Sequence, residues 1–136
     1  MKSLTEKILK NAKIIAIYGA STNKDKDSYM VMQYLQNQGY KTIPINFFTE
    51  EAYVLGEKIY KNLEDVKINL DILNIFRPSN EILEIVKKSM NVNIKTFWLQ
   101  LDICCSESEK ILRDRGIIYI DNKCTKIEHL KFINNQ

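Results

Sequence analysis

The stretch Ile14-Ile15-Ala16-Ile17-Tyr18-Gly19-Ala20-Ser21 carries the clearest signal of the fold of this chain. Its first five residues form a continuous apolar run, which is typical of a strand whose two faces are both covered. A polar loop from Ser21 to Asp27 follows, and residues 29–35 then carry apolar side chains at helical spacing. The segment is therefore predicted as a strand, a loop and a helix, which is the first part of a βαβ unit.

The same alternation of short apolar runs and helical segments continues along the chain, with a shorter ordered piece expected near Gly56. The further predicted strands are Lys41–Ile45, Leu70–Phe76, Ile94–Leu99 and Ile117–Ile120. Further helices are predicted after a capping Ser79, over Ser106–Arg115 and over Lys126–Ile133. We therefore predict an α/β fold: one Rossmann-like domain over residues 1–136, with an open, mostly parallel five-stranded sheet and helices on both faces.

Composition and charge argue against several classes of protein. The 20 Lys and Arg residues are interspersed with 17 Asp and Glu residues, so the chain lacks the basic patch of a nucleic-acid-binding protein. The N-terminus does not resemble a signal peptide, and no apolar run approaches the length of a membrane span. The three cysteines lack the spacing of a zinc or redox site. We expect a cytoplasmic protein with free thiols, no metal, and no membrane or nucleic-acid partner.

The loop Gly19-Ala20-Ser21-Thr22 after the first strand is the first candidate for a ligand site. Ligands of such sheets bind beyond the carboxyl ends of the strands, where the strand order reverses. Backbone N–H groups and hydroxyls at the start of a helix can receive a pyrophosphate. A plain structural role, with Gly19 making the turn and Ser21 capping the helix, explains the loop equally well. The dinucleotide fingerprint is absent, because the loop has a single glycine.

The end of the second strand also bears on the ligand. An NAD site of the Rossmann type carries an acidic residue there, whereas this chain has Asn46. An amide can bond a ribose but lacks the carboxylate that would repel a nearby phosphate. Coenzyme A carries a 3′-phosphate on that ribose, so Asn46 suits coenzyme A better than NAD. Lys24 and Lys26 can supply countercharge, although lysines in an exposed loop are more often simply solvated.

Two further strand ends carry polar side chains whose roles the sequence leaves open. Arg77 follows the third strand, where its planar cation can face a phosphate, stack on an adenine, or only steer the turn into Pro78. Gln100 follows the fourth strand, where it can bond the amides of a pantetheine arm or tie down the loop. Both residues are candidates because the carboxyl ends of parallel strands meet at one edge of the sheet.

The sequence offers no recognisable catalytic group. His129 is the single histidine, which excludes a metal centre built on several histidines, and its helical surroundings favour a structural role. The cysteines at positions 104, 105 and 124 show no spacing that suggests a nucleophilic pair with it. The chain contains neither a G-x-S-x-G elbow nor a Walker loop. We therefore expect a protein that is not an enzyme.

Several short stretches occur in an order and at intervals that are specific when they are taken together. They are Ile17-Tyr18-Gly19-Ala20-Ser21, Asp27-Ser28-Tyr29, Gly39-Tyr40 with Ile43-Pro44-Ile45-Asn46, Phe76-Arg77, Trp98-Leu99-Gln100-Leu101 and Lys126-Ile127-Glu128-His129. In these stretches nearly the whole chain resembles the small, stand-alone CoA-binding-domain proteins. Those proteins look like the nucleotide-binding N-terminal domain of the succinyl-CoA synthetase α subunit.

The resemblance implies a Rossmann-like domain whose cofactor is coenzyme A or an acyl-CoA. It places Gly19, Ala20 and Ser21 at the diphosphate, with Thr22 and Lys26 in the same loop. It places Asn46 on the adenosine side, Phe76 and Arg77 beside the adenine and ribose, and Gln100 toward the pantetheine. The family has no well-established reaction, so the resemblance implies a ligand and not a catalytic activity.

Two departures from the family pattern qualify this expectation. Phe47 and Phe48 stand where relatives usually carry proline and often a basic residue, and Lys26 replaces an arginine that is common in the first loop. Reduced affinity for coenzyme A, or preference for dephospho-CoA or another adenine nucleotide, would follow. The leading hypothesis is a non-catalytic module that binds coenzyme A, with an unspecified protein partner.

Two alternatives stay open. One is an NAD(P)-type or CoA-using enzyme whose catalytic residues are not recognised. The other is a protein-interaction domain whose degenerate pocket is filled by Phe47 and Phe48.

Overall fold

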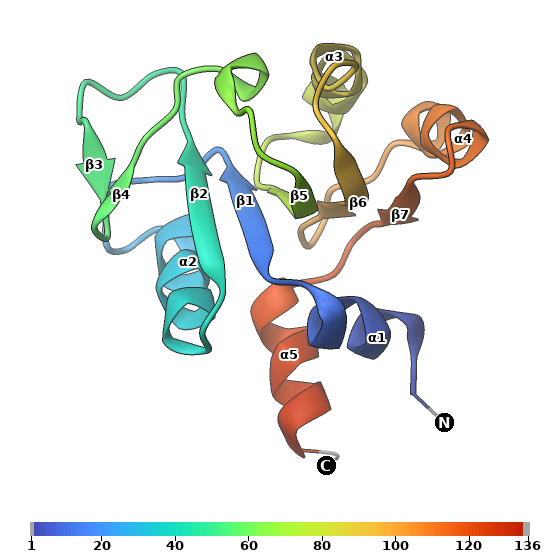
Figure 1. The fold of residues 1–136 in the computed structure, drawn as a ribbon, viewed down its shortest axis with the longest axis horizontal. Coiled ribbons are helices and arrows are strands. Elements are labelled where there is room, and N and C mark those ends of the chain that lie inside the picture. Colours follow the sequence, from blue (N-terminus) through green and yellow to red (C-terminus); the bar gives the residue numbers. More distant parts are fainter. Residues whose placement is uncertain (1, 135–136) are drawn as a thin grey trace.

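Within residues 2–134, which the computed structural model describes, five parallel strands form an open sheet in the order β2-β1-β5-β6-β7 (Figure 1). Their bounds are β1 Ile14–Tyr18, β2 Lys41–Ile45, β5 Leu70–Ile75, β6 Ile94–Leu99 and β7 Ile118–Ile120. These bounds lie within one residue of the ranges predicted from the sequence. The prediction of a Rossmann-like α/β fold is confirmed.

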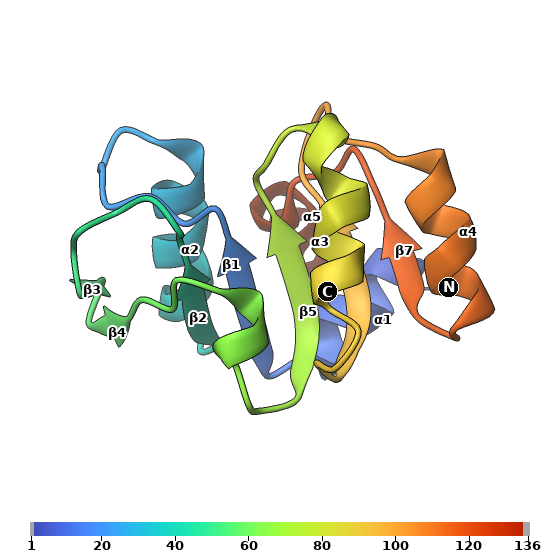
Figure 2. The ribbon, with the colours of Figure 1, turned by 90° about the horizontal axis from the view of Figure 1, so that it is seen from above.

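Helices cover both faces of this sheet, as predicted. On one face lie α1 (Leu4–Asn11), α2 (Asp27–Asn37) and α5 (Thr125–Asn134), and on the other lie α3 (Ile82–Lys88) and α4 (Ser106–Asp114) (Figures 1 and 2). Among the described residues, no helix is both long and apolar enough to cross a membrane.

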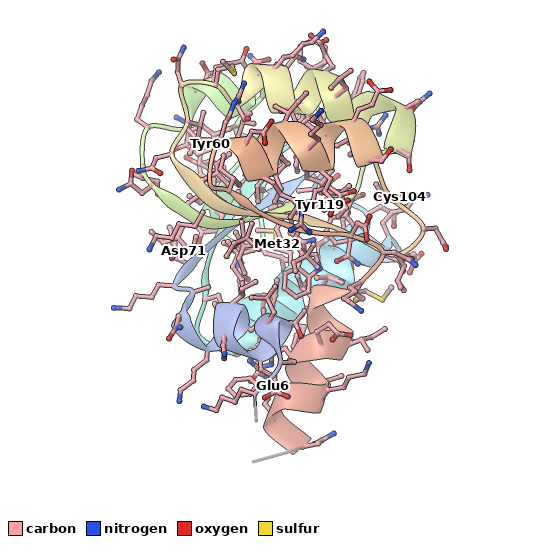
Figure 3. All side chains as sticks on the ribbon, turned by 90° about the vertical axis from the view of Figure 1, so that its right-hand side faces the viewer. Glu6, Met32, Tyr60, Asp71, Cys104 and Tyr119 are labelled. Atoms are coloured by element: carbon pink, nitrogen blue, oxygen red, sulfur yellow. The ribbon has the colours of Figure 1, made fainter. Side chains whose placement is uncertain are left out.

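Side chains of β1 explain why its sequence is a continuous apolar run. Ile15 and Ile17 pack into the core beneath α1, α2 and α5, whereas Ala16 packs into the core on the side of α3 and α4. All three residues are fully buried, as is Met32 of α2, which lies in the layer between helix and sheet (Figure 3). A central strand with two covered faces has no solvent-facing position, so no alternation with polar residues develops.

Three local features differ from the sequence prediction or add to it. Helix α1 was not predicted, although the Ser3 hydroxyl caps it by accepting the Glu6 N–H at 3.2 Å. The ordered piece near Gly56 is a small antiparallel hairpin of β3 (Tyr53–Val54) and β4 (Glu57–Lys58). The predicted capping role of Ser79 is wrong: a 3₁₀ turn (Ser79–Glu81) precedes α3, and the Ser79 hydroxyl instead accepts the Cys104 N–H at 3.0 Å.

The strand order places a potential site at one edge of the sheet. The chain passes from β1 to β2 on one side and later returns to β5 on the other side of β1, so the order reverses between β1 and β5. In Figure 2 the strands point toward one edge, and the connections after β1, β5, β6 and β7 run along it. This reversal point is where open α/β sheets bind their ligands.

Candidate functional site

A cleft of about 1090 Å³ opens at the carboxyl ends of β1, β2, β5 and β6. Seven of the nine predicted site residues line it together: Gly19, Ser21, Lys26, Asn46, Phe76, Arg77 and Gln100. The other two, Ala20 and Thr22, are not among its lining residues. Ala20 is buried beneath the loop and faces the core under α2. The topology thus gathers residues that are up to 81 positions apart, from Gly19 to Gln100, at one edge.

Gly19 follows β1 and lies close to the ends of β2 and β5. Its N–H and that of Ala20 both donate to the Ile45 carbonyl at the end of β2, at 2.8 and 3.1 Å. Its φ is +88°, and a Cβ at this position would lie 3.1 Å from Cδ of Arg77, which follows β5. Glycine is therefore required here both by the backbone conformation and by the close approach of the arginine stem.

The backbone amides of the first loop are largely occupied by the protein itself. The Ser21 N–H donates to the Ser28 hydroxyl, and the Asn23 N–H donates to the Ser21 hydroxyl, both at 3.0 Å. Ser21 therefore shapes the loop and does not cap α2, whose N-cap residue Lys26 makes no side-chain capping bond. The N–H groups of Asp27 and Ser28 have no acceptor among residues 2–134. The free positive end of α2, more than the loop before it, is available to an anion.

Arg77, which also lines the cleft, is held in an ion pair. Its Nε and Nη2 donate to the two carboxylate oxygens of Glu81 at 3.1 and 2.7 Å, and the hydrogen bonding to Glu81 raises the pKa of the guanidinium. Its Cζ lies 5.5 Å from the ring centroid of Phe48. This geometry fixes the guanidinium as a flat surface beside an aromatic ring, which suits stacking better than a lone phosphate contact.

Phe47 and Phe48 extend outward from the end of β2. They are 62% and 73% exposed and contact each other edge to face, with centroids 5.4 Å apart. The two rings line the cleft without filling it. Exposed aromatic side chains beside an open cleft are available to a ligand, so the structure does not support a pocket closed by these rings.

The Asn46 side chain organises the loop that carries these rings. Its Nδ2 donates to the Ala20 carbonyl, and its Oδ1 accepts the N–H groups of Phe48 and Thr49 at 2.7 and 3.1 Å. The amide thus ties the loop after β2 to the loop after β1. One N–H of Nδ2 is left over, because an amide nitrogen has two donors.

Gln100 forms part of a buried polar floor. Its Oε1 accepts from Asn74 Nδ2 at 3.0 Å and from the Thr125 N–H at 3.2 Å. The Thr125 hydroxyl in turn donates to Asn74 Oδ1 at 2.8 Å. Gln100 is 6% exposed, and its Nε2 has no acceptor among residues 2–134. The oxygen therefore ties down the loop while the nitrogen remains a donor at the cleft, so both roles left open by the sequence are compatible.

Of the two lysines that the sequence suggested as countercharge, Lys26 lines the cleft and Lys24 does not, and most of the charge of the cleft was not anticipated. Five basic side chains line it against two acidic ones: Lys26, Lys61, Arg77, Lys88 and Lys126 against Asp27 and Glu81. Of these basic groups, only Arg77 pairs with a carboxylate in the part of the chain that the structure describes. Unpaired positive charge in a concave site attracts anions.

Apolar side chains line the same cleft. Met30, Leu101 and Ile127 are 42%, 50% and 43% exposed. They come from the first turns of α2 and α5 and from the loop after β6. An anionic ligand with an apolar or amphipathic arm would match this combination of surfaces.

The single histidine lies in an aromatic cluster and does not line the cleft. Nδ1 of His129 lies 2.8 Å from the Tyr34 hydroxyl, and its ring packs edge to face against Tyr34, Tyr40 and Phe132. Burial lowers the pKa of His129. Cys124 lines the cleft but is buried, and the three cysteines are unbridged. Within residues 2–134, no group of three or more His, Cys, Asp or Glu side chains is arranged to hold a metal ion.

Comparisons with known proteins cover the strands and loops that form the cleft. A family model for the CoA binding domain matches residues 13–130. The uncharacterized protein YneT of Bacillus subtilis (strain 168) is 31% identical over 128 residues, which are 94% of this chain and 93% of that protein.

Two solved structures share the fold along nearly the whole chain. The cell-free ID.343 protein from Thermus thermophilus has a TM-score of 0.86 at 33% identity, covering 93% of this chain and 94% of that one. A hypothetical protein from Pyrococcus horikoshii OT3 has a TM-score of 0.87 at 29% identity, covering 95% of this chain and 89% of that one.

Proposed function

The chain belongs to the CoA-binding-domain family, and we propose that it binds coenzyme A, free or acylated, in the cleft at the carboxyl edge of the sheet. We propose further that it is a binding module without a reaction of its own. The observation that carries the proposal is one open cleft in which seven predicted ligand residues meet unpaired lysines.

The diphosphate is assigned to the start of α2. The unoccupied N–H groups of Asp27 and Ser28 and the positive end of the helix dipole favour a negative group there. Lys26 lines the cleft at the same helix end and adds a full charge. Gly19 lines the same cleft and carries no side chain that could obstruct it.

The adenosine is assigned to the end of β2. In Rossmann-type sheets the ribose lies beside the residue that follows the second strand, which is Asn46 here. The remaining N–H of Asn46 can donate to a ribose hydroxyl. The flat surface of Phe48 and Arg77 nearby can stack on the base, which gains dispersion and cation–π energy.

The pantetheine arm is assigned to the other end of the cleft. The free Nε2 of Gln100 can donate to an amide carbonyl of the arm, and such a hydrogen bond contributes about 0.5–1.5 kcal/mol. Met30, Leu101 and Ile127 offer apolar contacts to the methylene groups of the arm or to an acyl group.

Two features favour coenzyme A over NAD. The end of β2 has an amide in place of the acidic residue that NAD sites use for the ribose diol. The net positive lining suits a ligand with three phosphate groups better than one with two.

The absence of a reaction is proposed from the side chains that face the cleft. The single histidine is packed among aromatic rings outside the lining, and Cys124 has no histidine or carboxylate partner among its hydrogen bonds in the described chain. A thioester such as acetyl-CoA should therefore release no thiol above the buffer rate when it is incubated with the protein. Turnover that depends on protein concentration would contradict this part of the proposal.

Calorimetric titration of the protein with coenzyme A and with NAD tests the ligand. We expect coenzyme A to bind and NAD to bind at least about tenfold more weakly, since the missing carboxylate and the extra phosphate act in the same direction. Equal affinities, or no heat with either compound, would contradict the proposal.

Ser21→Asp tests the position of the diphosphate. An aspartate oxygen can still accept the Asn23 N–H, so the melting temperature should stay close to that of the wild type. A negative charge beside the start of α2 should weaken coenzyme A by about tenfold. Retained affinity in this variant would contradict the assignment of the diphosphate to the start of α2.

A further inference from the structure

Lys61 lies in the cleft although it comes from a segment without regular secondary structure that the sequence did not connect to the site. The preceding residue, Tyr60, forms an isolated parallel bridge with Ile45 of β2. The Tyr60 carbonyl accepts the Asn46 N–H at 2.8 Å, and the Tyr60 N–H donates to the Pro44 carbonyl at 2.9 Å. These bonds fix the backbone that carries Lys61 beside the end of β2.

The ammonium group of Lys61 is nearly free of protein partners. Its one contact is the Thr49 carbonyl, at 3.5 Å, and no carboxylate lies within ion-pair distance of it in residues 2–134. Lys41 and Lys95, in contrast, are paired with Glu57 and Asp71. Lys61 lines the cleft, so its charge is available to a ligand there.

The other cations near this end of the cleft have different positions or partners. Arg77 is neutralised by Glu81. Lys26 is the N-cap residue of α2, so it lies at the helix start to which the diphosphate is assigned. Helix α2 covers the face of the sheet opposite to α3 (Figure 1). Glu50 and Glu51 follow the same loop as Phe48 but do not line the cleft. Lys88 and Lys126 line the cleft from α3 and α5, whereas Lys61 directly follows Tyr60, whose carbonyl accepts the Asn46 N–H. Among the unpaired cleft lysines of the described chain, Lys61 is therefore the one that the backbone holds next to Asn46.

From this arrangement we infer that Lys61 binds the 3′-phosphate of coenzyme A and makes the cleft selective for coenzyme A over its dephospho form. The inference rests on the proposed function, because it takes the ribose to lie at the end of β2. A ribose beside Asn46 brings its 3′ substituent to the residues around this strand end. A dianionic phosphate there requires a countercharge, and Lys61 provides it from a neighbouring segment, although Phe47 and Phe48 themselves carry none.

The test compares coenzyme A with dephospho-CoA, which differ only in the 3′-phosphate. The wild type should bind coenzyme A more tightly than dephospho-CoA by calorimetry. Lys61→Gln should lower the affinity for coenzyme A by about fivefold, as expected for the loss of one solvent-exposed ion pair. It should leave the affinity for dephospho-CoA unchanged. The difference between the two ligands in the wild type should shrink at higher ionic strength.

Two matched variants make the result specific. Lys26→Gln should lower the affinity for both ligands by the same factor, because both carry the diphosphate that is assigned to the helix end beside Lys26. Lys67→Gln, outside the cleft, should weaken neither, because the Lys67 ammonium contacts only the Glu64 carbonyl within the described chain.

The outcomes separate the two proposals. If Lys61→Gln weakens both ligands equally or weakens neither, while the wild type still binds coenzyme A, the role of Lys61 is refuted and the proposed function stands. If the wild type binds neither ligand, the proposed function itself is refuted, and the assignment of Lys61 with it.

Discussion

At the amino end of the sheet the Asp71 carboxylate has its partners within the protein, whereas most of the basic groups in the cleft at the carboxyl end have none in the described chain. Asp71, near the start of β5, accepts the backbone N–H groups of Lys13 and Ile14 at 2.8 and 2.9 Å, and the Lys95 ammonium lies 3.3 Å away. At the opposite edge, four cleft lysines have no carboxylate partner within residues 2–134. Figure 3 shows how far apart these ends are, with Asp71 at one side and Cys104, which follows β6, at the other.

The pKa of Asp71 records the difference. Partial burial opposes its ionisation, but the hydrogen bonds from Lys13 and Ile14 and the charge of Lys95 outweigh burial and lower the pKa below its ordinary value. At the amino end, the Asp71 carboxylate of β5 therefore binds the backbone at the start of β1 and the Lys95 side chain of β6. The carboxyl end leaves donors and cations without partners in the described chain, and we attribute this to a ligand that completes them.

The largest effect should come from Gly19→Val at the carboxyl end. A β-branched residue is strained at a φ of +88°, and its Cβ would press on the Arg77 stem at 3.1 Å. We expect the free energy of unfolding to fall by about 3 kcal/mol and binding of coenzyme A to be lost.

Gly116→Val is the matched control for that substitution. Its φ is +75°, but a Cβ there would meet no atom within 4 Å, and the residue does not line the cleft. Denaturant unfolding should show a smaller loss of stability, and affinity should be kept. Loss of binding in both variants would mean that stability, not the cleft, controls affinity.

The buried floor beneath the carboxyl end should give the next largest effect. Thr125→Val keeps the side-chain shape but leaves the fully buried Asn74 Oδ1 without its donor at 2.8 Å. We expect a loss of about 2 kcal/mol in the free energy of unfolding, the usual cost of an unsatisfied buried acceptor. As a control, Thr22→Val at an exposed position should lower the free energy of unfolding by less than about 0.5 kcal/mol. If both variants lost the same amount of stability, the hydrogen bond between Thr125 and Asn74 would not be stabilising.

The sequence predicted the strands well because burial on both faces leaves a continuous apolar run, as in β1. It also predicted which loops line the cleft, because the carboxyl ends of parallel strands must meet at one edge. Asn74 was a missed signal of the same kind, since a polar residue within an apolar strand needs a buried partner.

Side-chain partners were not predictable in the same way. The pairing of Arg77 with Glu81, the hydrogen bond between Ser79 and Cys104, and the position of Lys61 depend on contacts made only after folding. The hairpin of β3 and β4 turns through Leu55 at a φ of 49°, a conformation that leucine rarely adopts, so local preference did not reveal it.

Asp71→Asn tests the role of charge at the amino end. Because the folded pKa is depressed, the stabilisation is complete above the unfolded pKa of about 3.9 and is lost as the pH falls through the lower folded value. We expect the variant to be about 1 kcal/mol less stable at pH 7, with the difference disappearing in acid. Affinity for coenzyme A should not change, and a stability difference independent of pH would contradict the ionic role.

The smallest effect should come from Glu81→Gln in the cleft. Glutamine can still accept a hydrogen bond from Arg77 but carries no charge, so the lining becomes more positive. We expect the affinity for coenzyme A to rise about two- to threefold by calorimetry, with little change in stability. Weaker binding would show that the ion pair itself is needed to hold Arg77 against the ligand.

Hydrogen–deuterium exchange with and without coenzyme A reports both ends of the sheet in one experiment. We expect slower exchange on binding in residues 19–30, 46–49 and 76–82, which carry the loops and helix start around the cleft. Residues 12–14 and 70–72, around Asp71, should exchange as they do without the ligand. Slower exchange at the Asp71 end, or no change along the chain at saturating ligand, would contradict a coenzyme A site at the carboxyl edge.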